Sequence, residues 1–174
     1  VMDSGSDYEK LVPVDVTKGR AKVVTDAIRI LKEETSEVPI VGNLTGPIST
    51  ASSLMEPVIF YKELRKKNKD AHAYMEFVTD QLIAFGKAQI EAGADVIAIS
   101  DPSGTGEILG PKYFKEFAVT YLNKLLDGLQ TAGLGTIVHI CGHMGSVYNE
   151  INEVKSSALS FDSVVPMKEA RAHL

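Results

Sequence analysis

The chain alternates short apolar runs with longer stretches whose apolar residues recur every three or four positions. The short runs fall at residues 38–42, 94–99, 136–141 and 158–161. Apolar runs of this length, bounded by glycine and polar residues, are typical of buried β-strands. The longer stretches between them have the helical period, so the pattern predicts four strand–helix repeats.

Helices are predicted between the runs from this period. The longest begins near Asp70, a residue type that favours helix N-termini, and ends at Gly93, where a left-handed C-terminal cap fits. Residues 1–16 have no usable periodicity and predict a loop, as do residues 43–48. The other predicted helices cover residues 17–34, 49–55, a segment opened by Pro57, one that starts at Pro111, residues 144–154, and a last one from Pro166.

The apolar runs are nearly continuous, which is typical of parallel strands buried on both faces and joined by right-handed helical crossovers. The fold class is therefore α/β, and two architectures fit: an open doubly wound sheet or a (β/α)8 barrel of the TIM type. A whole barrel needs about 250 residues. A chain of 174 residues with four strands would thus be a fragment of about four β/α units if it is a barrel.

Composition narrows the class of protein. The 18 basic and 23 acidic residues give a net charge of −5, which argues against nucleic acid as a partner, because phosphate binding needs clustered Lys and Arg. No apolar run approaches the roughly 20 residues that span a bilayer, so no membrane partner is expected. A single cysteine excludes a disulfide scaffold and fits the reducing cytoplasm.

Candidate metal ligands stand at the end of the third apolar run. His139 and Cys141 are two residues apart, so in a strand their side chains point the same way. Imidazole and thiolate are ligands that zinc prefers, and Gly142 leaves room beside them. The alternative is that both are core residues, with Cys141 a small hydrophobe. His143 is either a further ligand or an exposed loop residue.

Polar residues end the other runs. Asp101 and Asp162 follow the second and fourth runs, where carboxylates bind substrate, orient a ligating histidine or cap the next helix. Ser103, in a glycine-rich loop, and Asn43, after the first run, either contact a ligand or form turns. The loop lacks the lysine and spacing of nucleotide-binding motifs. These four residues are the substrate-binding candidates.

Three segments, at residues 42–52, 88–95 and 111–117, resemble the uroporphyrinogen decarboxylase superfamily in order and spacing. The resemblance covers most of the chain from about residue 17 onward. Members of that superfamily are (β/α) barrels longer than this chain. The resemblance implies that residues 1–174 are the central part of a single barrel domain, with N-terminal and C-terminal barrel units missing.

Within the superfamily, the run His139-Ile140-Cys141-Gly142 resembles the methylcobamide:coenzyme M methyltransferase branch, as does Asp101-Pro102-Ser103. In that branch the His-x-Cys pair supplies two zinc ligands. The third ligand is a further cysteine, which this sequence does not contain.

The resemblance implies a zinc-dependent, corrinoid-dependent methyltransferase. It would move a methyl group from a methylated corrinoid, carried on a separate corrinoid protein, to a small thiol such as coenzyme M. Zinc would activate the thiol, so no protein side chain is expected to be the nucleophile or another catalytic residue. The alternatives are a uroporphyrinogen decarboxylase-like enzyme, which needs no metal, and a non-catalytic binding domain.

Overall fold

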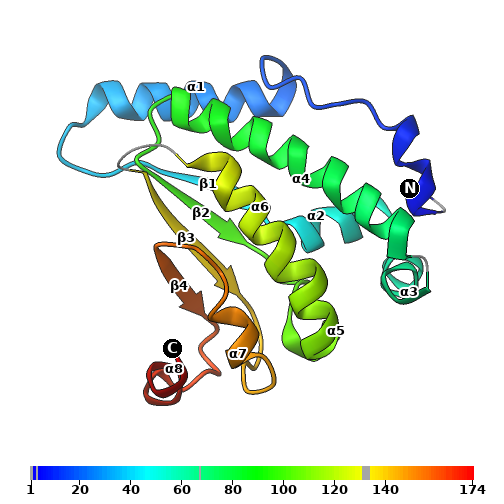
Figure 1. Ribbon diagram of the computed structural model, residues 1–174. Helices are drawn as coiled ribbons and strands as arrows, with labels where there is room; N and C mark the ends of the chain where they lie inside the picture. Colours follow the sequence, from blue (N-terminus) through cyan, green and yellow to red (C-terminus); the bar gives the residue numbers. More distant parts are fainter. Residues whose placement is uncertain (1, 3, 67, 131–133) are drawn as a thin grey trace.

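The computed structural model describes residues 2, 4–66, 68–130 and 134–174 (Figure 1). Its sheet has four parallel strands in the order β1-β2-β3-β4. Each strand therefore pairs with its predecessor in sequence, as in a (β/α)8 barrel, whereas the strand order of a doubly wound sheet reverses at a switch point. The strands are β1 (Val41–Thr45), β2 (Val96–Ser100), β3 (Gly135–Ile140) and β4 (Ala158–Phe161).

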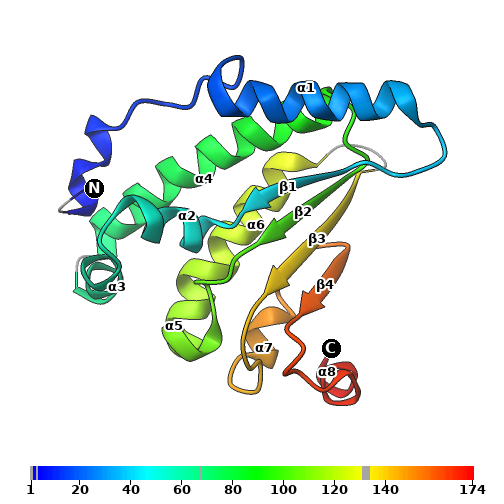
Figure 2. The same cartoon turned by 180° about the vertical axis from the view of Figure 1, so that it is seen from behind.

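Helices cover one face of this sheet. Figures 1 and 2 show α4 and α6 side by side on that face, with α1 packed against α4. Among the described residues, no helix is both long and apolar enough to cross a membrane. The helices are α1 (Gly19–Glu34), α2 (Pro47–Leu54), α3 (Pro57–Lys66), α4 (Asn68–Glu91), α5 (Gly106–Tyr113), the π-helix η2 (Phe114–Val119), α6 (Thr120–Leu129), α7 (Tyr148–Ile151) and α8 (Met167–His173).

Side chains alternate along the strands between the helix-covered face and the opposite face. Ile97, Ile99, Val138 and Ile140 are buried against the helices. The opposite face, here called the open face, carries no helix of the described chain in Figure 2. Register and alternation place on it Asn43, Thr45, Ala98, Ser100, Ile137, His139 and Ser160. In a closed barrel this face is the interior.

The first strand differs from its prediction. It covers Val41–Thr45 rather than residues 38–42, so Asn43 lies within a strand and not in a loop. Pairing with β2 sets this register, because Leu44 then lies opposite Ile99 and both are buried under the helices. Residues 1–16 also contain more than a loop, since a 3₁₀-helix, η1, covers Gly5–Lys10.

The helix predicted from Pro111 begins earlier. Thr105 caps α5, since its side-chain oxygen accepts a hydrogen bond from the Ile108 amide at 3.2 Å. Gly110, with φ of 69°, then interrupts the helix before η2 and α6 continue it. The helix predicted over residues 144–154 is also shorter, with α7 covering only Tyr148–Ile151. The assignment of residues 1–174 to the central part of one barrel domain stays a prediction.

Candidate metal and substrate site

A row of polar side chains crosses the open face near the carboxyl ends of the strands. Thr45 pairs with Ser100, Ser100 pairs with His139, and His139 pairs with Ser160. Register partners in parallel strands point to the same side of the sheet. The row therefore places one imidazole among three hydroxyl groups, at the end of the sheet where α/β folds bind ligands.

His139 and Cys141 lie together at this end, as their spacing predicts. The distance from His139 Nε2 to Cys141 Sγ is 3.3 Å, and both residues are half-buried rather than enclosed in the core. A nitrogen and a sulfur donor this close have the chemistry and the access that a zinc ion requires. Among the described residues, however, no group of three or more His, Cys, Asp or Glu side chains is arranged so that it could hold a metal ion. The pair thus fits zinc as two of its ligands.

The turn after Cys141 is held by two carboxylates. Gly142 has φ of 77°, a left-handed conformation that favours glycine, and its N–H donates to Asp162 Oδ2 at 3.1 Å. The N–H of His143 donates to Glu107 Oε2 at 3.1 Å, while the His143 side chain is exposed. Glu107 was not singled out from the sequence. Its signal is its place in the first turn of the helix that follows the glycine-rich loop.

Asp162 sits beside this turn and caps no helix, because α8 begins at Met167 with Pro166 as its N-cap residue. The hydrogen bond from the Gly142 N–H, and to a smaller extent the one from the Val164 N–H, hold the pKa of the Asp162 carboxyl below its ordinary value. The side chain is therefore a carboxylate near neutral pH. Contact between Asp162 and a substrate stays a prediction.

Asp101 is buried completely at the end of β2, with an exposed fraction of 0%. Its carboxyl oxygens accept hydrogen bonds from the Ser49 amide at 2.7 Å, the Ser49 hydroxyl at 2.6 Å and the Ile48 amide at 3.2 Å. Burial raises the pKa of Asp101, and these hydrogen bonds partly oppose that rise. The geometry assigns Asp101 to holding the first turn of α2 against β2, and its contact with a substrate stays a prediction.

The other two substrate candidates lie apart from the His139 and Cys141 pair. The Ser103 amide donates to Ser49 Oγ at 2.9 Å, so Ser103 belongs to the same network as Asp101. Asn43 is exposed on the open face, and the side chain of Gln89 binds its backbone at 3.0 Å on both N–H and C=O. Within the described chain, neither residue has a hydrogen bond to His139 or Cys141.

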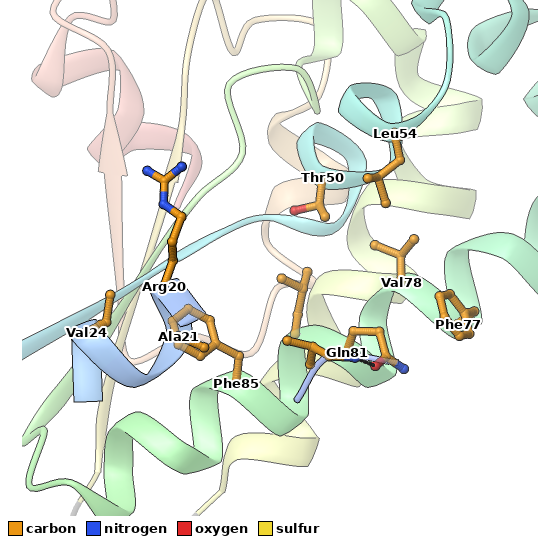
Figure 3. Close-up of a pocket in the computed structure, with 11 residues that line it drawn as sticks. Arg20, Ala21, Val24, Thr50, Leu54, Phe77, Val78, Gln81 and Phe85 are labelled. Carbon is orange, nitrogen blue, oxygen red and sulfur yellow. Dashed lines mark hydrogen bonds between the residues drawn. The ribbon is translucent and has the colours of Figure 1, made fainter. Parts of the chain in front are cut away.

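A separate cavity of about 320 Å³ opens on the helical side, between α1, α2 and α4 (Figure 3). Its walls are mostly apolar, and none of the site candidates lines it. The amide of Val14 bridges to Gln81 Oε1 at 2.9 Å at its edge. The residues that line it are Val14, Arg20, Ala21, Val24, Thr50, Leu54, Phe77, Val78, Gln81, Leu82 and Phe85.

The family model for uroporphyrinogen decarboxylase (URO-D) matches residues 1–174, the whole length of the sequence. The chain belongs to the uroporphyrinogen decarboxylase family. Its relatives include enzymes named for different activities. A methylcobamide:CoM methyltransferase, MtbA of Methanosarcina acetivorans, is 31% identical over 98% of this chain and 50% of its own length. A uroporphyrinogen decarboxylase of Myxococcus xanthus is 29% identical over 97% of this chain and 49% of its own length.

A solved structure, a methyltransferase from Methanosarcina mazei, superimposes with a TM-score of 0.87 at 32% identity. The match covers 96% of this chain and 50% of that one. Together with the strand order, it confirms the prediction of a partial (β/α)8 barrel, and the superfamily prediction is confirmed as well. This member of an enzyme family spans about half the length of the curated relatives it matches.

Proposed function

We propose that this protein is a zinc-dependent methyltransferase that moves a methyl group from a methylated corrinoid to a thiol such as coenzyme M. The observation that carries the proposal is the 3.3 Å approach of His139 Nε2 to Cys141 Sγ at the carboxyl end of β3. Similarity to methylcobamide:CoM methyltransferases, at 31% identity for MtbA, supports the choice of substrates.

In this proposal His139 and Cys141 hold the metal, and the substrate thiol is the nucleophile. When bound, zinc supplies a Lewis acid that lowers the pKa of the thiol, so that it is a thiolate near neutral pH. The sulfur–carbon bond forms as the carbon–cobalt bond breaks, and the electron pair of that bond stays on the corrinoid. The protein's own side chains bind and orient, and none forms a covalent bond to the methyl group.

The surrounding residues support this division of roles. Asn43 faces the open side of the sheet and Asp162 lies beside the turn after Cys141, so both remain candidates for substrate contact. Asp101 and Ser103 are proposed to act by fixing the loop after β2 against α2. The corrinoid protein is proposed to dock over the strand ends. The lone free cysteine is in keeping with a cytoplasmic location.

The alternative is a uroporphyrinogen decarboxylase-like activity, which the Myxococcus xanthus relative at 29% identity favours. Such an enzyme has no use for a metal at His139 and Cys141. Zinc content therefore separates the two proposals.

The test is the zinc content of the purified full-length protein and of its Cys141→Ser variant. We expect about one zinc per chain in the wild type, and its loss in the variant because a thiolate ligand is removed. His143→Ala is the matched control, since this neighbouring imidazole is exposed. It should keep its zinc. A follow-up assay mixes methylcobalamin with coenzyme M and measures the methylated thiol.

A wild type free of zinc that decarboxylates a porphyrinogen would refute the methyltransferase proposal. Zinc retained by Cys141→Ser would show instead that this pair is not the metal site.

A further inference from the structure

The strand next to β3 supplies a hydrogen bond to the ring of His139. Ser160 of β4 is the register partner of His139, and its Oγ lies 3.0 Å from His139 Nδ1. The other ring nitrogen, Nε2, faces Cys141 Sγ at 3.3 Å. The two nitrogens of one imidazole thus point to two different groups, a hydroxyl on one side and a thiol on the other.

This arrangement bears on which nitrogen carries the proton. A neutral imidazole has one N–H and one nitrogen with a free lone pair, and only the latter can bind a metal. The Ser160 hydroxyl can accept a hydrogen bond from Nδ1–H or donate one to a bare Nδ1. When it accepts, the proton is on Nδ1, and the lone pair of Nε2 is directed toward Cys141.

The other neighbour of His139 in the row does not share this contact. Ser100 pairs with His139 from β2, yet the hydrogen bond of the ring goes to Ser160. Asp162, which directly follows β4, accepts a hydrogen bond from the N–H of Gly142, the residue after Cys141. The end of β4 therefore supports both ligand positions, one through a side chain and the other through the main chain.

We propose that Ser160 is a positioning residue that holds His139 in the Nδ1–H tautomer, so that Nε2 is the metal-binding nitrogen. As a statement about zinc, the inference rests on the proposed function. As a statement about the tautomer, it stands on the contact between Ser160 and His139 alone. Partners of this kind behind a ligating histidine typically change metal affinity about 10- to 100-fold when removed.

The first experiment measures zinc affinity of the full-length protein by competition with a chromophoric chelator. Ser160→Ala is expected to bind zinc about 10- to 100-fold more weakly than the wild type. Ser160→Thr keeps the hydroxyl and should restore affinity close to the wild-type value. Ser100→Ala is the matched control, because it removes a hydroxyl from the other flank of His139, and it should bind zinc as the wild type does.

The second experiment records the ¹⁵N resonances of His139 in the zinc-free full-length protein near pH 8. We expect the Nδ1–H tautomer in the wild type and in Ser160→Thr, and a shift toward the Nε2–H tautomer in Ser160→Ala. An Nε2–H tautomer in the wild type would overturn the inference. So would equal zinc affinity in Ser160→Ala and the wild type.

The two proposals fail in different ways. A wild type that binds no zinc refutes the metal assignment, while the ¹⁵N spectra still decide the role of Ser160. If the wild type binds zinc, Cys141→Ser loses it and Ser160→Ala keeps it with unchanged affinity, the metal site is supported and the role of Ser160 is overturned.

Discussion

Replacing Asp101 tests whether this carboxyl group holds the fold together at the strand ends. In Asp101→Ala the amides of Ile48 and Ser49, which now donate to the carboxyl oxygens at 3.2 and 2.7 Å, lose their acceptor. Both residues are buried, so water does not replace the lost carboxyl oxygens as acceptor. We expect the first turn of α2 to detach from β2 and the protein to lose stability.

The magnitude follows from these two amides. Each buried donor left without a partner costs about 1–3 kcal/mol, so Asp101→Ala is expected to lower the free energy of unfolding by about 2–6 kcal/mol. Asp101→Asn keeps one oxygen for the Ser49 amide but turns an NH₂ group toward the Ile48 N–H. Its expected cost is therefore about 1–3 kcal/mol, because only one donor is left unpaired.

The assay is urea unfolding of the full-length protein, followed by circular dichroism. The free energy of unfolding falls by about 3 kcal/mol per M of urea, so the lost stability in Asp101→Ala lowers the midpoint of urea unfolding by roughly 0.7–2 M. Asp127→Ala is the matched control, because Asp127 is an exposed aspartate whose carboxylate pairs with Lys155 at 2.8 Å. Its midpoint should stay near the wild-type value, since exposed ion pairs contribute at most about 1 kcal/mol.

Equal midpoints for Asp101→Ala and the wild type would refute this reasoning. The carboxyl group would then be free for another role, and the earlier prediction that it contacts a substrate would regain its support.

Three further predictions follow from single positions. Gly86→Ala places a methyl group 2.5 Å from Leu129 Cδ2, between α4 and α6, and should lower the free energy of unfolding by about 1–3 kcal/mol in the same urea assay. Gly142→Ala must adopt φ of 77° at a cost of about 1–2 kcal/mol, and a zinc titration should show weaker binding because the turn after Cys141 shifts. A hydrogen bond from the Ile40 N–H, and to a smaller extent one from the Lys32 side chain, hold the pKa of Asp95 below its ordinary value of 3.8. The ionised carboxylate therefore stabilises the folded state above pH 3.8, and this contribution is lost as pH falls through the lower folded-state pKa. The urea midpoints of Asp95→Asn and the wild type should differ at pH 6 and converge below pH 3.8. A difference that stays constant with pH would contradict the assignment.

Periodicity in the sequence was enough to find the strands and the longer helices. The apolar runs at 94–99 and 158–161 coincide closely with β2 and β4, and the helix predicted to end at Gly93 is α4, which ends at Glu91. These features depend on local order along the chain. A run of apolar residues bounded by glycine or polar residues needs no distant partner to indicate a buried strand.

Element boundaries were less well predicted, because they depend on neighbours in space. The limits of β1 were shifted by its pairing with β2, and α5 began earlier because the Thr105 side chain caps it. The η2 helix was missed for a similar reason. Its apolar spacing is that of an ordinary helix, with Phe114 and Phe117 both buried in the core, and does not distinguish a π-helix from an α-helix.

The sequence alone predicted that His139 and Cys141 lie together at the end of the third strand, because side chains two residues apart in a strand point the same way. The strand covers Gly135–Ile140 rather than residues 136–141, so Cys141 directly follows it, yet its Sγ still lies 3.3 Å from His139 Nε2. Tertiary structure decided which groups surround them. Ser160 lies 21 residues from His139 in sequence, and Asp101 lies 52 residues from Ser49, yet each pair is in hydrogen-bond contact. Such contacts are set by the register of parallel strands and by the placement of a helix over a strand end, neither of which is encoded in any single segment of the chain.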